Sequence, residues 1–228
     1  MKKFSVVILN VEIWQSLTEI CASAANQVSA KVNEILQNRD VANIIFAAAP
    51  SQNELLTSLL SIPNIEWSRI NAFHMDEYIG LDADAPQTFG RFLKTKLFDL
   101  VPLKEIYYIN PGDVQSECLR YAGLLETYPP DIVCLGIGEN GHLAFNDPPV
   151  ADFNDPELVK IVKLDEDCRN QQVNDGCFNT LDSVPKTAIT LTIPALLSAG
   201  YLSCVVPGAT KANAVKNTIE GDISTSCP

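Results

Sequence analysis

A glycine-rich segment near the middle of the chain carries the side chain best suited to proton transfer. His142, one of two histidines, follows Gly136, Gly138 and Gly141, and Asp147 lies shortly after it. Histidine exchanges protons near neutral pH, and a neighbouring carboxylate fixes which ring nitrogen carries the proton. Glycines let a ligand approach the main chain closely. The segment therefore predicts a catalytic or binding histidine rather than a glycine turn whose histidine only satisfies buried backbone groups.

A second segment, residues 73–80, places two carboxylates side by side. Asp76 and Glu77 follow an apolar run and precede Tyr78. Adjacent carboxylates raise each other's pKa by repulsion between like charges, which suits a general base. Helix capping or a solvated acidic turn would explain the same residues, and this tripeptide alone does not decide between them. We expect His74 to be a pocket wall or a hydrogen-bonded scaffold residue rather than a catalyst.

A lysine close to the carboxyl end of the chain could hold an anion. Lys211 ends the segment 207–211, which follows an apolar run and opens a helical pattern. The N-terminus of a helix attracts anions, and a lysine adds a positive charge that suits phosphate. Most surface lysines bind nothing, so this segment indicates a phosphate site only together with the other two.

Short apolar runs alternate with helical periodicity along the chain, and this pattern predicts an α/β fold. We expect strands at 4–9, 43–48, 69–73, 131–135, 188–192 and 202–206, helices along 13–36, 54–60 and 209–219, and a polar turn at 76–78. The prediction is one domain over 1–228, with a doubly wound, mainly parallel, Rossmann-like sheet between helices on both faces. Ligands of such sheets bind beyond the carboxyl ends of the strands, which points to loops 49–53, 74–80, 136–149 and 207–211.

The composition excludes several other classes of function. A net charge of −12 without a cluster of basic residues argues against a nucleic-acid partner. Seven scattered cysteines indicate reduced thiols, and no apolar stretch is as long as a membrane span. We therefore expect a soluble, cytoplasmic protein with no membrane partner.

Familiar catalytic and cofactor motifs are also missing or out of context. No nucleophile elbow, zinc-binding H-E-x-x-H pattern or Walker loop is present. Residues 136–141 match G-x-G-x-x-G in letters only, because a histidine-containing loop follows them where a dinucleotide site needs a helix.

Four segments resemble, in order along the chain, motifs of the glucosamine-6-phosphate deaminase/isomerase family, within a wider group that includes 6-phosphogluconolactonases. Residues 73–78 resemble F-N-M-D-E-Y, and 138–148 resemble G-x-[DN]-G-H-[IL]-[AG]-F-N-E-P. Residues 184–190 resemble V-P-x-x-A-[IL]-T, and 208–211 with 220–221 resemble G-x-x-K and the later E-G. The resemblance implies conversion of glucosamine 6-phosphate to fructose 6-phosphate and ammonia, without a metal or other cofactor.

The resemblance also implies a role for each site residue. Asp76 would move a proton between C2 and C1 of the open-chain sugar. His142 would assist ring opening, oriented by Asp147, with Asn140 in the same cluster. The remaining residues implied in binding the substrate and its phosphate are Ser51, Gln52, Gly138, Lys211 and Arg169, the last as a substitute for an arginine of the relatives.

One departure from the family pattern keeps alternatives open. Residues 47–52 read A-A-A-P-S-Q where relatives have a T-G-x-T-P loop. A galactosamine-6-phosphate isomerase or a 6-phosphogluconolactonase-like hydrolase would keep the fold and change the substrate. A non-catalytic sugar-phosphate sensor is a third possibility, against which the retention of Asp76 and His142 speaks. The sequence also ends at Pro228, so we expect the family's last strand to be absent, and the resemblance allows a homo-oligomer.

Overall fold

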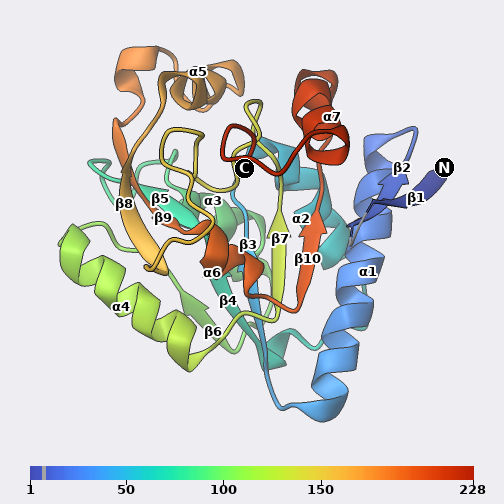
Figure 1. Ribbon diagram of the computed structural model, residues 1–228. Helices are drawn as coiled ribbons and strands as arrows, with labels where there is room; N and C mark the ends of the chain where they lie inside the picture. The colour runs from blue at the N-terminus through green and yellow to red at the C-terminus, as the bar shows by residue number, and fades with distance from the viewer. Residues whose placement is uncertain (7–8) are drawn as a thin grey trace.

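The computed structural model describes residues 1–6 and 9–228, and a parallel sheet forms the centre of these residues (Figure 1). The strand order is β10-β7-β3-β4-β6, and every neighbouring pair is parallel. The strands are β3 (Ala42–Phe46), β4 (Ile70–His74), β6 (Glu105–Tyr107), β7 (Ile132–Leu135) and β10 (Tyr201–Cys204). From β3 the chain first adds β4 and β6 on one side, and later β7 and β10 on the other. The predicted doubly wound α/β fold is confirmed.

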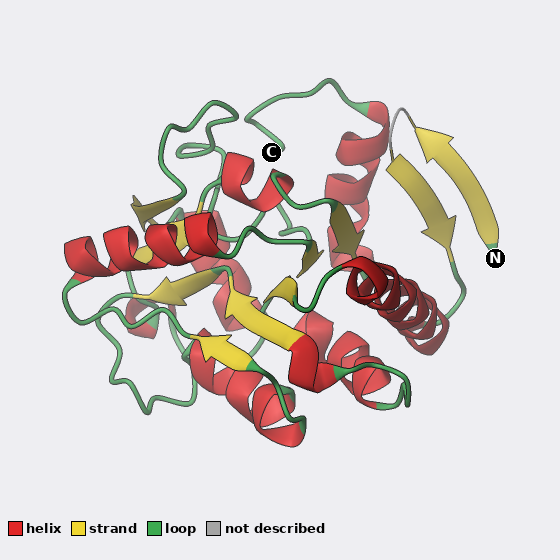
Figure 2. Cartoon of the chain, turned by 90° about the horizontal axis from the view of Figure 1, so that it is seen from below, coloured by secondary structure: helices red, strands yellow, loops and turns green. Residues whose placement is uncertain are grey.

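Helices cover both faces of this sheet, as the view from below shows (Figure 2). They are α1 (Leu17–Asn38), α2 (Asn53–Leu60), α3 (Phe89–Lys96), α4 (Val114–Thr127), α5 (Glu166–Asn174), α6 (Ile193–Leu197) and α7 (Ala212–Glu220). Successive strand residues point to opposite faces. Ile44 and Phe46 accordingly pack in a cluster with α1, α2 and α3, whereas Ile45 and Val133 pack in another with α4 and α6. No helix among the described residues is long and apolar enough to cross a bilayer.

A smaller antiparallel sheet packs beside the central one and corrects one prediction. Its order is β5-β9-β8, with β5 at Asp76–Tyr78, β9 at Thr187–Leu191 and β8 at Val159–Lys163. The expected polar turn at 76–78 is therefore a strand, and it is buried throughout. The strand expected at 188–192 exists, but in this second sheet. The main chain passes directly from the central sheet to the smaller one, because Met75 alone separates β4 from β5. The carbonyl of Met75 accepts from the Leu191 N–H at 2.8 Å.

The amino-terminal part of the chain differs from the expected strand and helix. Strands β1 (Lys2–Val6) and β2 (Leu9–Ile13) form an antiparallel pair outside the central sheet. Positions 7–8 of the predicted strand lie outside the described residues. The long helix begins at Leu17, because Ser16 and Glu19 form a capping box in which each side chain accepts from the other's backbone N–H.

The remaining differences concern elements with weak local patterns. The helix expected at 209–219 forms as a short 3₁₀ turn, Ala209–Lys211, followed by α7. Another 3₁₀ turn, Pro50–Gln52, leads into α2. Further 3₁₀ turns are Trp67–Arg69, Phe98–Leu100 and Leu181–Ser183. The sequence did not predict β6, β8, α3, α4, α5 or α6.

Candidate active site

The predicted loops meet where the order of the central sheet reverses, between β3 and β7. In doubly wound sheets this is where ligands bind. A small cavity of about 70 Å³ lies there. It is lined by residues that follow β3, β4, β7 and β10, together with residues of α5: Ala47, Ala48, Ala49, Ser51, Gln52, Met75, Asp76, Phe89, Gly136, Ile137, Gly138, His142, Ala144, Phe145, Gln171, Gln172 and Lys211. Ligand pockets usually measure roughly 300–1,000 Å³, so lining side chains have to move to admit a hexose.

Six of the predicted site residues line this cavity. They are Ser51, Gln52, Asp76, Gly138, His142 and Lys211. Two more, Asn140 and Asp147, lie behind His142 and contact its ring. Only Arg169 lies elsewhere. Segments separated by more than a hundred residues in the sequence therefore converge as the strand order requires.

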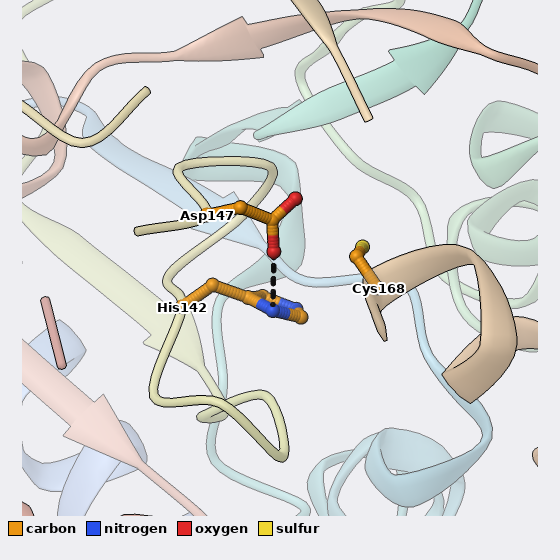
Figure 3. Close-up of side chains that lie close together, drawn as sticks. All are labelled: His142, Asp147 and Cys168. Carbon is orange, nitrogen blue, oxygen red and sulfur yellow. Dashed lines mark ion pairs between the residues drawn. The ribbon is translucent and has the colours of Figure 1, made fainter. Parts of the chain in front are cut away.

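His142 is held by two acceptors on one side of its ring, and Figure 3 shows one of them, Asp147. Its Nδ1 lies 2.7 Å from Asn140 Oδ1 and 3.0 Å from Asp147 Oδ1. Asn140 Nδ2 in turn donates to Asp147 Oδ1 at 3.1 Å. Because both neighbours accept, Nδ1 carries a proton, which leaves Nε2 to exchange a proton with a ligand. Burial acts to raise the pKa of Asp147, but its bonds with His142 and Asn140 outweigh burial and hold the pKa below the ordinary value.

The backbone around His142 has no room for a larger residue at Gly138. A Cβ atom built on Gly138 would lie 2.2 Å from the His142 ring, and the Gly138 N–H donates to the His142 carbonyl at 2.9 Å. Gly141 has a φ of +90°, which a residue with a side chain rarely adopts. The glycines thus let the main chain fold back against the imidazole.

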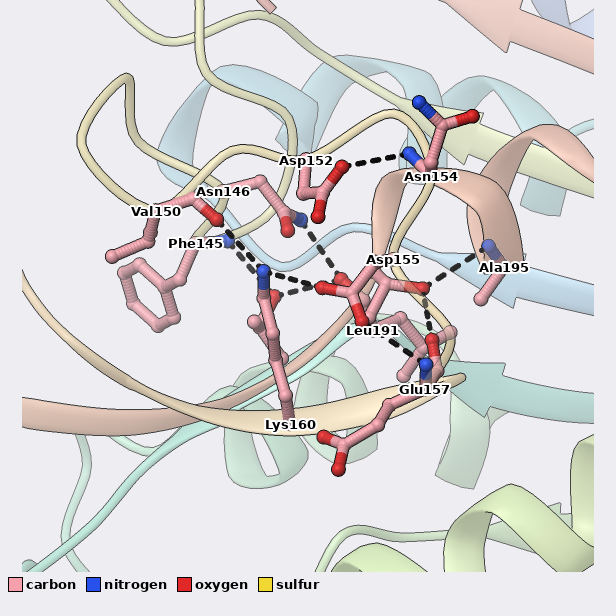
Figure 4. A network of polar contacts seen from close by, with 12 residues as sticks. Phe145, Asn146, Val150, Asp152, Asn154, Asp155, Glu157, Lys160, Leu191 and Ala195 are labelled. Atoms are coloured by element: carbon pink, nitrogen blue, oxygen red, sulfur yellow. Dashed lines mark hydrogen bonds and ion pairs between the residues drawn. The ribbon is translucent and has the colours of Figure 1, made fainter. Parts of the chain in front are cut away.

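The rest of the loop is fastened to the second sheet (Figure 4). Asn146 Nδ2 donates to the carbonyls of Leu143 and Leu191, at 2.9 and 2.8 Å. Lys160 Nζ, on β8, donates to the Val150 carbonyl and to Asp155 Oδ2, both at 2.8 Å. Since the Lys160 and Asp155 side chains are 13% and 10% exposed, this ion pair is largely buried. The part of the loop that follows the histidine is therefore anchored at two points.

The two adjacent carboxylates take different positions, because neighbouring residues of a strand face opposite sides. Asp76 lines the cavity, while the oxygens of Glu77 accept from the backbone N–H groups of Tyr78, Phe89 and Gly90 at 2.8 to 3.1 Å. Burial, and then the charge of Glu77, raises the pKa of Asp76 well above its ordinary value. Burial also raises the pKa of Glu77 to about 6, against the three N–H bonds. One carboxylate thus faces the cavity and the other caps α3.

His74 is a hydrogen-bonded scaffold residue, one of the two roles that the sequence predicts for it. Its ring is fully buried, with Nδ1 2.9 Å from the Asp76 carbonyl and Nε2 2.8 Å from the Ile109 N–H. Nε2 must accept, so Nδ1 donates. Burial lowers the pKa of His74 to about 4, which keeps the ring neutral. The residue positions the backbone of Asp76.

Lys211 gives the wall of the cavity a positive charge. It is 7% exposed, and among the described residues it makes no ion pair. Burial lowers the pKa of its ammonium group. Ser51 and Gln52 line the cavity as well, and Gln52 Nε2 is held by the Val205 carbonyl at 3.2 Å. A buried cation without a counter-ion suits an anionic group of a ligand.

Two glutamines of α5 complete this side of the cavity, and the sequence did not predict them. Gln171 is engaged, because its amide accepts from the Glu139 N–H and donates to Asp175. Gln172 is 8% exposed and lines the cavity. No motif in the sequence marks Gln172 as a binding residue.

The structure does not bring Arg169 to this cavity. Its guanidinium donates to the carbonyls of Leu181 and Val184, at 2.6 and 3.1 Å, so it ties α5 to the chain before β9. Arg169 lines a separate cavity of about 500 Å³ with Lys163 and Lys186. These two bonds hold the guanidinium away from the cavity that Gln172 lines, although the two residues lie only three positions apart on α5.

Comparison with known proteins agrees with this arrangement. Residues 15–228 match the family model of glucosamine-6-phosphate isomerases/6-phosphogluconolactonase. A glucosamine-6-phosphate deaminase of Bacillus cereus (strain G9842) is 39% identical over 166 residues, which are 72% of this chain and 62% of that protein. One of Bacillus thuringiensis (strain Al Hakam) is 38% identical over the same shares. The alignment thus spans less than two thirds of these curated relatives.

Solved structures share the fold. A protein described as a monomeric glucosamine-6-phosphate deaminase superposes with a TM-score of 0.86 at 29% identity, covering 94% of this chain and 89% of that one. A 6-phosphogluconolactonase of Thermotoga maritima gives a TM-score of 0.74 at 19% identity, with 91% and 88% covered, and shows likeness of fold alone. The chain therefore belongs to the family of glucosamine-6-phosphate isomerases and 6-phosphogluconolactonases.

Proposed function

We propose that this chain converts glucosamine 6-phosphate to fructose 6-phosphate and ammonia, by aldose–ketose isomerisation with deamination. The observation that carries the proposal is the placement of Asp76 and His142 on the wall of one cavity that also holds Lys211. A carboxylate, an imidazole and an ammonium group supply a base for carbon, an acid for oxygen and a charge for phosphate. The deaminases at 38–39% identity support the same assignment.

The acid–base steps follow from these positions. A protonated His142 gives its Nε2 proton to the ring oxygen while the O1 hydroxyl loses its proton to solvent, and the sugar opens to the aldehyde. Asp76 then takes the proton from C2 and O1 takes one from solvent, which forms an enolamine, and Asp76 returns its proton to C1. The resulting C2 iminium adds water and releases ammonia, which leaves the ketose. Asp147 and Asn140 keep Nδ1 protonated and turn Nε2 toward the substrate.

The environment of Asp76 suits a base that removes a proton from carbon. Its carboxyl group is 6% exposed, and burial beside Glu77 raises its pKa. A carboxylate with a raised pKa binds a proton more strongly than an exposed one, which suits a base that removes a proton from carbon.

The phosphate end of the proposed site differs from that of relatives. We assign the phosphate to Lys211, to segment 49–52 with Ser51 and Gln52, and to the Gln172 amide, while Gly138 leaves room beside the imidazole. The alanines at 47–49 offer no side-chain hydroxyl. This favours, as second candidates, galactosamine 6-phosphate as substrate or hydrolysis of a phosphosugar lactone on the same acid–base pair.

The decisive experiment is ammonia release from glucosamine 6-phosphate and from galactosamine 6-phosphate. We expect release from one of them, and loss of release in His142→Ala. Asp76→Asn should abolish turnover while sugar-phosphate binding, measured by calorimetry, is retained. Equal loss of binding and turnover in Asp76→Asn would contradict its role as the base. Binding without turnover in the unaltered protein would favour a sugar-phosphate sensor.

We place the protein in the cytoplasm, where phosphosugars are metabolised and thiols stay reduced. All seven cysteines are free thiols, which supports this compartment. A homo-oligomer stays a prediction, to be checked by light scattering.

A further inference from the structure

A buried thiol lies next to the histidine–carboxylate pair and has no part in the proposed reaction. Cys168 lies in the first turn of α5, and its side chain extends toward His142 and Asp147 (Figure 3). One ligand atom from each of the three residues lies within 4.8 Å of the other two. The residues are 1%, 8% and 0% exposed, in the order Cys168, His142 and Asp147. A nitrogen, an oxygen and a sulfur donor thus gather in one shielded place.

One oxygen of this cluster lacks a partner. Asp147 Oδ1 contacts His142 and Asn140, whereas the buried Asp147 Oδ2 makes no hydrogen bond of ordinary geometry among the described residues, although the Cys168 thiol and the Asp165 backbone lie close to the carboxylate. Buried carboxylate oxygens are nearly always paired, so an unpaired one requires an explanation. An ion bound beside Oδ2 would provide that partner.

The donor set suits zinc better than other common divalent ions. Zn²⁺ binds thiolate, imidazole and carboxylate groups in a tetrahedron, and sites with three protein ligands keep the fourth position for water. Mg²⁺ and Ca²⁺ prefer oxygen ligands and would not use the thiol. A thiolate and a carboxylate together balance the charge of Zn²⁺, so the buried complex is neutral. Asn140, which bonds both Asp147 and His142, would orient the ligands.

An ion can approach the cluster from either of two cavities. His142 lines the smaller cavity, and Asp147 lines the larger cavity of about 500 Å³. Two residues of the buried cluster therefore border a cavity each, and Cys168 packs against the core.

We propose that His142, Asp147 and Cys168 bind one Zn²⁺ ion, and that the bound ion switches off proton transfer by His142. On binding, the Cys168 thiol releases its proton to solvent and no group is oxidised or reduced. The imidazole binds the metal through a ring nitrogen without a proton, so a proton held on that nitrogen first passes to solvent or to the other ring nitrogen. The bound ring can no longer become the imidazolium that serves as the acid for ring opening. The inhibition rests on the proposed function, whereas the metal site itself does not.

Direct binding tests the site without any substrate. The metal-free protein is titrated with Zn²⁺ against a chromophoric chelator, and we expect one equivalent to bind. Cys168→Ser nearly keeps the size of the side chain and should weaken zinc binding by about 100-fold or more, because loss of a partner that only orients a ligand already costs roughly 10- to 100-fold. Cys227→Ser is the matched control, because Cys227 packs against Gly141 on the same loop and lies outside the cluster. Its zinc affinity should equal that of the unaltered protein.

Cobalt gives an independent signature of the ligands. Co²⁺ in the unaltered protein should show the near-ultraviolet absorption of a thiolate–cobalt bond, and Cys168→Ser should lose it. If Cys168→Ser fails to fold, as judged by circular dichroism, Asp147→Asn is tested by binding alone and should also weaken zinc binding. No bound zinc, or equal affinity in Cys168→Ser and the unaltered protein, would overturn the site.

Turnover then separates the two proposals. Zn²⁺ should inhibit ammonia release, the chelator EDTA should restore it, and Cys168→Ser should remain active and resist zinc. Inhibition that is equal in Cys168→Ser would overturn the switch. Zinc binding that depends on Cys168 in a protein with no turnover of either amino sugar would keep the metal site and reject the proposed function.

Discussion

Replacement of His74 should change how the stability of the protein depends on pH. The ring is fully buried, donates to the Asp76 carbonyl and accepts from the Ile109 N–H. Burial lowers its pKa from 6.5 to about 4. As the pH falls, the unfolded chain takes up a proton at this histidine near pH 6.5, whereas the folded protein does so only near pH 4. The unfolded state gains over that interval, so stability is lost as the pH falls from 6.5 to 4.

The size of the effect follows from the two pKa values. With values of 6.5 unfolded and about 4 folded, His74 alone lowers the free energy of unfolding by about 2 kcal/mol between pH 7 and pH 5. Glu77 acts in the opposite direction. Its folded pKa of about 6 lies above its ordinary 4.5, so its contribution to stability grows as the pH falls through that range. The effect of His74 must therefore be read as a difference between variants.

Two variants isolate the histidine, and each keeps one of its hydrogen bonds. His74→Gln places an amide oxygen near the Ile109 N–H, and His74→Asn places an amide N–H near the Asp76 carbonyl. Neither side chain titrates. Each leaves one buried backbone group unpaired, which should cost about 1–3 kcal/mol at pH 7.

Urea unfolding at pH 7 and pH 5, followed by circular dichroism, measures the difference. Between these two pH values, the unaltered protein should lose about 2 kcal/mol more than either variant. If the free energy of unfolding falls in parallel for all three proteins, His74 is not held neutral by burial and the reasoning is wrong.

Three further predictions test the site and its supports. Because burial raises the pKa of Asp76, kcat/KM should rise with pH, and the pKa read from the acid side of this profile should lie above that of an ordinary carboxyl group. A pKa near 4 in that profile would contradict the prediction. Lys211→Met should lower kcat/KM for the phosphosugar about 10- to 100-fold by removing a charged contact of roughly 1.5–3 kcal/mol, with the exposed Lys216→Met on α7 unchanged. Lys160→Met leaves Asp155 buried and unpaired and should cost about 3–5 kcal/mol in urea unfolding, whereas equal stability of Lys160→Met and the exposed control Lys163→Met would contradict it.

The sequence predicted the central sheet and the converging loops because both depend on local patterns. Apolar runs such as 131–135 are as long as a buried strand, and the rule for parallel sheets then places the loops that follow them at one edge. His142 and Asp76 could be singled out because their residue types and their places after strands were both visible.

The second sheet could not be predicted in this way, because its stability comes from distant partners. Asp76 and Glu77 look like a solvated turn, yet Glu77 is buried against N–H groups of α3 twelve and thirteen residues later. The helix α5 was missed for a related reason. Its buried residues include Gln171 and Gln172, so polar side chains occupy the face that a periodicity argument expects to be apolar.

The second sheet also explains how the proposed base and acid keep a fixed separation. Asp76 on β5 lies opposite Thr190 on β9 in the antiparallel register. The Oγ1 of the same Thr190 accepts from the Phe145 N–H at 3.1 Å, and the carbonyl of the next residue, Leu191, accepts from Asn146. Strand β9 thus holds Asp76 through the strand pairing with β5, and it holds the histidine loop through two further hydrogen bonds. Since a positioned pair of groups loses catalytic effect when either moves, β9 determines the geometry of the site although none of its residues lines the cavity.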